Sequence, residues 1–355
     1  MQHNALIVGA SGVIGSALAE RLLNGQWRVY GLSRGRTPVP AGCESMVADL
    51  ADAESVASAL KNLKVDRVFF TAWARQDTER ENIRVNGAMA SNVLDALGGS
   101  LENGHVALVT GLKHYLGPFE SYATGAVPAT PFREEQGRLP VDNFYYEQED
   151  RLFAAAKRHG FTWSVHRPHT IVGYAIGNAM NMGVTLAAYA TLCKHTGRPF
   201  IFPGSATQWH GMTDVTDARL LASHLEWAAT HGQGQNQDFN VVNGDVFRWQ
   251  WMWSQIADYF GLDAAPFPDQ MSPLGDRMQD AAPLWSDIAG HFGLREANID
   301  KLASWWHTDA DLGRPMEILT DMGKSRKAGF LEYQNTRDGF IDLFDRLKAE
   351  RIIPA

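Results

Sequence analysis

The amino-acid sequence predicts an α/β protein, with a Rossmann-type, doubly wound parallel sheet and a smaller, mainly helical substrate lobe. Two observations carry this prediction. An apolar run at 5–8 leads into Gly9, Gly12 and Gly15 at three-residue spacing, and then into a helical pattern at 16–23. This order of strand, glycine loop and helix is typical of a dinucleotide-binding βαβ unit. Apolar runs of strand length then alternate with helical segments up to about residue 166, which indicates parallel strands joined by helices.

Each glycine of the first loop has its own physical task. Gly9 can turn tightly off the strand because it has no Cβ, Gly12 lets the backbone approach a pyrophosphate, and Gly15 lets the helix pack close to the strand. The free N–H groups and the positive dipole end at the helix start attract phosphate. A glycine-rich turn that binds nothing is the alternative, but the strands that follow favour binding. Besides the three glycines, we expect the cofactor to contact Ser11, Val13 and Ile14.

A second strand at 27–32 ends in Ser33 and Arg34. An NAD-specific site places Asp or Glu here, about 20 residues past the glycine loop, to bind the ribose 2′-hydroxyl. No acid is present, whereas a hydroxyl donor and a planar guanidinium suit a 2′-phosphate. A solvated basic loop is the alternative interpretation. We therefore predict that the cofactor is NADP(H).

The remaining elements of the cofactor lobe follow in order. Strands are predicted at 45–48, 65–71, 106–110 and 161–166, and helices at 54–63, 78–97 and 143–159. Ligands bind at the carboxyl ends of parallel strands, so residues that follow strands are expected beside the cofactor. These are Asp49, Leu50, Thr71, Ala72, Trp73, Thr110, Gly111, Pro168, Thr170 and Ile171.

Residues 111–142 are rich in Gly, Pro and polar side chains and are predicted to form a long loop. A stretch of this length without regular structure is usually functional when the domain is otherwise compact. We therefore expect functional side chains here.

The character of the sequence changes after residue 173. We predict a helix at 178–190, a turn-and-strand region at 197–205, edge strands of the first lobe at 212–215 and 239–242 with a helix at 217–230 between them, and helices at 249–260, 285–292 and 337–348. The predicted domains are a cofactor domain (1–173 and 212–243) and a substrate lobe with a lid (174–211 and 244–355). The cleft between two such lobes is the default place for a substrate.

Composition excludes several classes of function. The net charge of −8 argues against a duplex-binding surface, which needs clustered Lys and Arg. No apolar run approaches the roughly 20 residues of a membrane span. The first strand begins within five residues of Met1, which leaves no room for a signal peptide, so we expect a cytoplasmic protein. Cys43 and Cys193 have no metal-ligand spacing, and no metal is expected. The sequence is compatible with a monomer and with a homodimer.

These features together resemble the extended short-chain dehydrogenase/reductase superfamily. The glycine loop matches, as do Asp49-Leu50, Asn86, and Arg167-Pro168 closing with Gly173. The usual catalytic pair of the superfamily is Tyr with Lys four residues later on one helix face. Here the residue four after Tyr145 is Glu149, and four after Tyr146 is Asp150.

The progesterone 5β-reductase/iridoid synthase-like family also lacks a lysine four residues after its tyrosine. Residues 110–122, TGLKHYLGPFESY, resemble its lysine motif, and residues 143–150, NFYYEQED, resemble its tyrosine motif. Segments 164–168, 239–247 and 329–331 are also similar, so the resemblance covers nearly the whole chain. It implies NADPH-dependent reduction of the activated C=C bond of α,β-unsaturated carbonyl compounds. Where the family often has Gly-Asn after Arg-Pro, near the nicotinamide, this chain has His169-Thr170.

The resemblance implies that Tyr145 and Lys113 form the catalytic pair, although their spacing alone would suggest two surface residues. In 1,4-reduction, hydride reaches the β-carbon and charge builds on the carbonyl oxygen, which a Tyr O–H can stabilise. A nearby ammonium adds positive charge. We expect the substrate pocket to include Phe119, Tyr122, Tyr146, Met180, Met182 and Phe330.

Alternatives apply to several of these residues. Core packing is equally expected for the two methionines, and Tyr146 is an alternative acid. The stretch 329–331 is predicted to belong to a lid that excludes water. His114, His166 and His169 are expected to be structural, since no carboxylate or cysteine lies at ligand spacing.

Two other classes of function stay open. One is a ketone reductase acting by 1,2-addition, or a sugar-nucleotide epimerase, within the same superfamily. The aromatic, methionine-bearing C-terminal part argues against a sugar nucleotide. The other is a non-catalytic NADP(H)-binding sensor, which would have no need of the lysine and tyrosine motifs.

Overall fold

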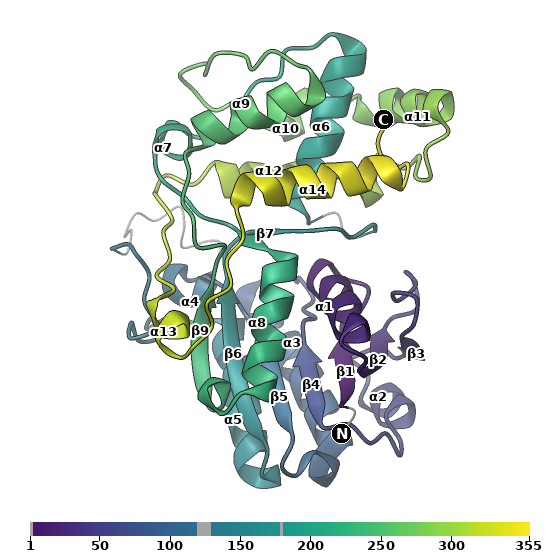
Figure 1. Ribbon diagram of the computed structural model, residues 1–355, viewed down its shortest axis with the longest axis vertical. Coiled ribbons are helices and arrows are strands. Elements are labelled where there is room, and N and C mark those ends of the chain that lie inside the picture. The colour runs from purple at the N-terminus through teal and green to yellow at the C-terminus, as the bar shows by residue number, and fades with distance from the viewer. Residues whose placement is uncertain (1–2, 119–128, 178–179) are drawn as a thin grey trace. The chain divides into compact units, whose positions relative to one another are not determined.

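The computed structural model describes residues 3–118, 129–177 and 180–355 and contains the expected α/β sheet (Figure 1). Seven parallel strands lie in the order β3-β2-β1-β4-β5-β6-β9. They are β1 (Asn4–Val8), β2 (Arg28–Ser33), β3 (Glu44–Val47), β4 (Arg67–Phe70), β5 (His105–Val109), β6 (Thr162–Pro168) and β9 (Gln237–Val241). The chain moves outward from β1 in one direction through β3, and then in the other from β4. This topology confirms the predicted doubly wound Rossmann fold.

Helices cover both faces of this sheet. They are α1 (Val13–Asn24), α2 (Ala53–Ala59), α3 (Glu79–Leu97), α5 (Phe144–His159) and α8 (Ala218–Thr230). One hydrophobic cluster joins α2, α3 and α5 to the side chains of β1, β4, β5 and β6 that point toward them. On the other face, α1 and α8 lie side by side and are joined by an ion pair of Arg21 with Glu226 at 2.5 Å. Strand β5 is buried along its whole length because both faces are covered.

The other part of the chain is mainly helical. It contains α6 (Met182–Thr196), α7 (Ala206–His210), α9 (Trp249–Phe260), α10 (Leu274–Arg277), α11 (Ala281–Phe292), α12 (Trp305–Leu312) and α14 (Thr336–Ala349), with a small parallel pair of β7 (Ile171–Val172) and β8 (Thr216–Asp217). Aromatic rings fill its core: Trp253 stacks on Phe200 with ring centroids 4.2 Å apart and meets Phe202 edge-on. The many tryptophans beyond residue 200 therefore include several that build this core.

The chain forms two compact units. One contains Met1–His169, Arg219–Val242 and Thr320–Glu332, and the other contains Thr170–Ala218, Asn243–Leu319 and Tyr333–Ala355. The predicted substrate lobe began at 174 and kept everything after 244. In the structure, the segment 320–332, with α13 (Gly323–Lys327), belongs to the first unit. Long-range contacts decide this: Lys324 pairs with Asp238 of β9, and the Ser325 hydroxyl bonds to His224 of α8.

Two local predictions differ from the structure. Residues 113–116, predicted as loop, form the short helix α4 (Lys113–Leu116), which is too short to leave a periodic signal in the sequence. Residues 212–215 do not join the large sheet as an edge strand. Thr213 instead makes isolated bridges with Phe247 and Ile318, and the neighbouring β8 pairs with β7.

Smaller boundary differences concern the second unit. The helix predicted at 178–190 is described from Met182 to Thr196, and α7, α10 and α12 were not predicted. Within the described ranges, no helix is both long and apolar enough to pass through a membrane.

Candidate active site

The glycine loop after β1 has the backbone that its sequence demands. Gly9 adopts a positive φ of 93°, and its N–H donates to the carbonyl of Leu32 at the end of β2 (2.9 Å). A Cβ on Gly15 would lie 2.2 Å from the carbonyl oxygen of Gly9, so only glycine permits this approach of α1 to the loop. Gly12 is the N-cap of α1 and has no side chain to occupy the helix start. The loop thus forms a cradle that leaves the amino end of α1 open toward a phosphate.

The predicted ribose-side residues lie at the ends of β2 and β3. Ser33 ends β2, and its hydroxyl accepts the N–H of Gly35 at 3.2 Å. Arg34 is exposed, and among the described residues it has no hydrogen-bond or ion-pair partner. Asp49 is exposed after β3, while the carbonyl of Leu50 accepts the side-chain amide of Asn92 at 2.9 Å. These side chains thus follow two neighbouring strands of the sheet.

The segment after β4 packs against the end of β1 and the glycine loop. Thr71 donates from both its N–H and its hydroxyl to the carbonyl of Val8, each at 2.9 Å. Asn86 of α3 holds Ala74 at both ends: its Oδ1 accepts the Ala74 N–H at 2.8 Å, and its Nδ2 donates to the Ala74 carbonyl at 2.9 Å. Ala72 lies so close that a Cβ on Gly9 would come within 3.0 Å of it. The end of β4 is thus held against the glycine loop. The residues expected beside the cofactor after this strand are Thr71, Ala72 and Trp73.

Lys113 is the first residue of α4 and is buried. Its Nζ lies 4.9 Å from the ring centroid of Phe144 and 5.4 Å from that of Trp73, and these two rings stack on each other. Aromatic faces attract an ammonium group at such distances. The Lys113 carbonyl accepts the side-chain amide of Asn143 at 2.8 Å, and Asn143 also caps α5 by accepting the N–H of Tyr145 at 3.0 Å. Asn143, which the sequence analysis did not single out, therefore ties the backbone of Lys113 to the helix start that carries Tyr145.

The two neighbouring tyrosines have different surroundings. Tyr145 is half-buried, and its hydroxyl lies where a Cβ on Gly111 would come within 3.2 Å of it. That same Cβ would lie 3.3 Å from the carbonyl oxygen of Pro168. Gly111 thus leaves room for the Tyr145 hydroxyl at the carboxyl ends of β5 and β6.

Tyr146 is buried and its hydroxyl is engaged twice within the protein. It donates to the carbonyl of His114 at 2.7 Å and accepts the N–H of Leu139 at 3.0 Å. Because both hydrogen bonds join Tyr146 to the backbone, we assign it a structural role instead of the expected contact with substrate.

The histidines considered at the sequence level lie in packed surroundings. Nε2 of His114 donates to the carbonyl of Gln136 at 3.2 Å, and burial lowers the pKa of His114 to about 4. His166 is fully buried in β6 and bonds to His224 of α8, with 3.0 Å between the two Nδ1 atoms. Burial also lowers the pKa of His224 to about 3. These groups are neutral at pH 7, and no metal-ligand cluster of three or more such side chains occurs in the described part of the chain.

The expected substrate residues do not form one group. Phe119 and Tyr122 lie outside the described residues. Met182 is buried in the core of the second unit, so we assign it to packing, and Met180 is half-buried. Thr170 and Ile171 belong to the second unit, where the Thr170 hydroxyl donates to Asp311 at 2.9 Å.

Phe330 is packed, not part of an exposed lid. Its side chain is 2% exposed and meets the ring of His224 edge-on, with centroids 4.5 Å apart. His224 bonds to His166, whereas the preceding residue of β6, Val165, packs with α5. Since successive strand residues point to opposite faces, Phe330 lies on the α8 face and α5 covers the other. For Phe330, the lid hypothesis is therefore corrected to a role in packing, whereas the neighbouring Leu331 is exposed.

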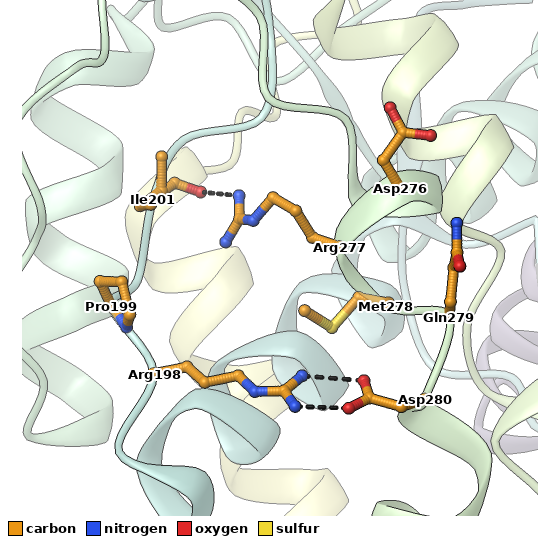
Figure 2. A pocket seen from close by; sticks show the side chains of 8 residues that line it. All are labelled: Arg198, Pro199, Ile201, Asp276, Arg277, Met278, Gln279 and Asp280. Atoms are coloured by element: carbon orange, nitrogen blue, oxygen red, sulfur yellow. Dashed lines mark hydrogen bonds and ion pairs between the residues drawn. The ribbon is translucent and has the colours of Figure 1, made fainter.

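One cavity of about 460 Å³ lies in the second unit. Figure 2 shows its lining side chains, which are Arg198, Pro199, Ile201, Asp276, Arg277, Met278, Gln279 and Asp280. Arg198 forms a two-pronged ion pair with Asp280, at 2.9 and 2.5 Å, and Arg277 donates to the carbonyl of Ile201 at 3.2 Å. Both arginines thus hold segments of the protein together, and the lining includes none of the predicted site residues that the structure describes.

Comparison with known proteins identifies sequence relatives. A family model, the PRISE-like Rossmann-fold domain, matches residues 46–354. Over 99% of its length, the chain is 39% identical to an (S)-8-oxocitronellyl enol synthase of Camptotheca acuminata, and the match covers 94% of that protein. Over 99% of its length it is also 38% identical to a 3-oxo-Delta(4,5)-steroid 5-beta-reductase of Arabidopsis thaliana, with 93% of that protein covered.

Solved structures share the fold at much lower identity. A putative epimerase from Burkholderia cenocepacia matches with a TM-score of 0.66 at 20% identity, covering 98% of both chains. A UDP-glucose 4-epimerase from Thermotoga maritima matches with a TM-score of 0.67 at 13% identity, covering 98% of this chain and 99% of its own. At this level of identity, the likeness establishes the fold.

Proposed function

The chain belongs to the PRISE-like Rossmann-fold family, and from this we propose that it reduces the activated C=C bond of α,β-unsaturated carbonyl compounds with NADPH. One observation carries the proposal. The buried ammonium of Lys113 lies against Trp73 and Phe144, at the helix start that carries Tyr145. The relatives named as a steroid 5-beta-reductase and as an enol synthase support the same class of substrate.

The described residues fit a dinucleotide with a 2′-phosphate. The loop at Gly9, Gly12 and Gly15 would hold the pyrophosphate, because Gly12 leaves the start of α1 without a side-chain cap and Gly15 lets α1 lie against the loop. Ser33 and the guanidinium of Arg34, which has no partner in the described part of the chain, would hold the 2′-phosphate. When bound, NADPH supplies the hydride that reaches the β-carbon of the substrate.

The protein's own contribution is positioning and charge stabilisation. Tyr145 donates its hydroxyl hydrogen bond to the carbonyl oxygen, where negative charge develops during reduction. Lys113 adds positive charge beside this site, and its burial against two rings keeps the ammonium poorly hydrated, which strengthens its field. A proton from solvent then reaches the α-carbon.

The test compares two adjacent tyrosines. Tyr145→Phe should lower kcat for 2-enone reduction by roughly 10²–10³ while NADPH still binds. Tyr146→Phe is the matched control: it loses two backbone contacts and should lower thermal stability while keeping far more activity. Lys113→Ala should also lose activity, and the double variant should fall by less than the product of the single effects, because the two groups act as a unit.

Product identification decides the reaction class. NADPH oxidation is followed with 2-enones, saturated ketones and sugar nucleotides, and a saturated ketone from a 2-enone is the expected product. An allylic alcohol would replace 1,4-reduction by 1,2-reduction, and activity of Tyr145→Phe with loss in Tyr146→Phe would reverse the assignment of the two tyrosines.

A further inference from the structure

We infer that Glu149 is a positioning residue that holds the short helix carrying Lys113, an inference that rests on the proposed function. Glu149 lies four residues after Tyr145 on α5. At this position the short-chain dehydrogenase/reductase superfamily, which the chain resembles, usually has its catalytic lysine. The chain thus has the opposite charge at that place and its lysine on another element. The contacts of Glu149 connect this carboxylate to the element that carries Lys113.

Glu149 is a buried anion between two cations. Its side chain is 2% exposed, with Oε2 at 2.9 Å from Nη2 of Arg138 and Oε1 at 3.4 Å from Nη2 of Arg167. Burial raises the pKa of Glu149, and the two guanidinium groups oppose that effect. A buried charge is tolerated when it is paired in this way.

Both arginines lead from Glu149 back to α4. Arg138 lies over the ring of Tyr146, 4.9 Å from its centroid, and the Tyr146 hydroxyl holds the carbonyl of His114. Arg167 reaches the hydroxyl of Tyr115 at 3.5 Å and pairs with Asp238 at 2.7 Å. The second and third residues of α4 are therefore held through groups that meet at Glu149.

The helix α4 depends on such support. It has four residues, all of them buried, and a helix of this length is not stable by itself. Asn143, the N-cap of α5, adds a further anchor through its bond to the carbonyl of Lys113. Removing the Glu149 charge takes one carboxylate partner from each arginine and leaves Arg138 with Asp150 and Arg167 with Asp238, so both side chains shift toward these partners and α4 loses its fixed place.

The same geometry excludes a catalytic lysine four residues after the tyrosine, which is the usual arrangement of the superfamily. Glu149→Lys would bring a third cation next to Arg138 and Arg167, which repel it. We therefore expect this variant to lose activity and not to replace Lys113, even though it recreates the Tyr and Lys spacing of four residues.

The kinetic experiment compares Glu149→Gln with Glu147→Gln. Glu147 lies on the same helix and pairs with Arg151, one turn further along it, at 2.7 Å, so its variant is the matched control and should keep parental kcat within about twofold. Glu149→Gln should lower kcat per folded molecule by roughly 10- to 100-fold, the usual cost of a small misplacement, with the NADPH Kd unchanged. Glu149→Asp keeps the charge and should recover part of the loss.

A double-variant comparison separates positioning from general damage. In a Lys113→Ala background, Glu149→Gln should change the residual kcat by less than about twofold, while it lowers the melting temperature as much as in the parent. An equal loss of kcat in both backgrounds would overturn the inference, because Glu149 would then not act through Lys113.

A second readout does not depend on the reaction. Lys113 is buried and Lys157 is exposed. Competitive labelling by an amine-reactive reagent should therefore modify Lys113 slowly in the parent protein. In Glu149→Gln, Lys113 should be labelled several-fold faster, while the labelling rate of Lys157 stays unchanged. Faster labelling in a protein that reduces no enone would leave the positioning role standing and refute the proposed function. Unchanged labelling of Lys113 in a folded Glu149→Gln variant would refute the positioning role.

Discussion

At the scale of single residues, the candidate site shows how one position along a helix changes the surroundings of a side chain. Tyr145 and Tyr146 differ by about 100° around α5. The first points its hydroxyl to the space beside Gly111, and the second is buried with its hydroxyl bonded to the backbone at both His114 and Leu139. Identical side chains thus have different surroundings, and the hydroxyl of Tyr146 is held by the backbone at two places.

Arg34 allows a prediction about the cofactor. Its guanidinium is exposed and has no partner among the described residues, as expected of a group reserved for a ligand. A charge-assisted contact of ~1.5–3 kcal/mol corresponds to roughly a 10- to 150-fold change. Arg34→Ala should therefore raise the KM for NADPH by that factor and leave the KM for NADH nearly unchanged. Arg36→Ala, at a neighbouring exposed arginine, is the control, and a parent enzyme that prefers NADH would contradict the assignment.

At the scale of elements, a line of buried histidines joins two strands to two helices. Ser164 of β6 bonds to Nε2 of His105 on β5 at 2.9 Å and to Nε2 of His166 at 2.8 Å. His166 bonds in turn to His224 of α8, and His224 bonds to Ser325 of α13 at 2.9 Å. Burial lowers the pKa values of His105 and His224 to about 3 each. These elements are therefore joined by neutral imidazoles.

This line predicts how stability depends on pH. The folded pKa values lie below the unfolded value of about 6.5, so below pH 6.5 the unfolded chain binds more protons than the folded one. Stability is then lost as pH falls from about 6.5 toward 3, by up to about 1.4 kcal/mol per pH unit for each histidine.

Urea unfolding between pH 7 and 4.5 measures this effect. His224→Gln keeps a hydrogen-bonding side chain without the titration, and should reduce the slope by roughly 1 kcal/mol per pH unit. His231→Gln, at an exposed histidine just after α8, should leave the slope as it is. Equal slopes in the parent and His224→Gln would show that the buried line does not control acid stability.

At the scale of the whole molecule, the chain passes repeatedly between its two units. The first unit is completed only by Arg219–Val242 and Thr320–Glu332, which supply the edge strand β9, most of α8 and Asp238, one of the ion-pair partners of Arg167. The second unit has its own aromatic core around Trp249, Trp253 and Trp285. Each unit is thus assembled from segments that are distant in sequence.

A truncated chain tests this interleaving. A fragment of residues 1–169 contains the glycine loop and both catalytic candidates but lacks α8 and β9, which uncovers one face of β6 and leaves buried Arg167 without Asp238. Arg167 keeps Glu149 in the fragment, but the loss of Asp238 together with the apolar cover of one sheet face removes a large share of a domain's stability. The fragment should therefore show no cooperative transition in thermal or urea unfolding followed by circular dichroism, unlike the full chain. A sharp transition in the fragment would show that the first 169 residues suffice.

The sequence by itself determined the features that depend on near neighbours. The glycine loop, the alternation of strands and helices as far as β6, and the family to which the motifs belong could all be predicted, because turn chemistry and periodicity are local properties. Helix α9, predicted at 249–260, begins and ends at those residues.

The tertiary structure alone decided the features that depend on distant contacts. Helix α4 has too few residues to be recognised by periodicity, and it exists because Asn143 and Tyr146 hold its carbonyls. The burial of Phe330 against α8, the inclusion of 320–332 in the first unit and the pairing of Glu149 with two arginines likewise join positions far apart along the chain. No local pattern encodes such pairings, because their free energy comes from burial and charge neutralisation that arise only when the segments meet.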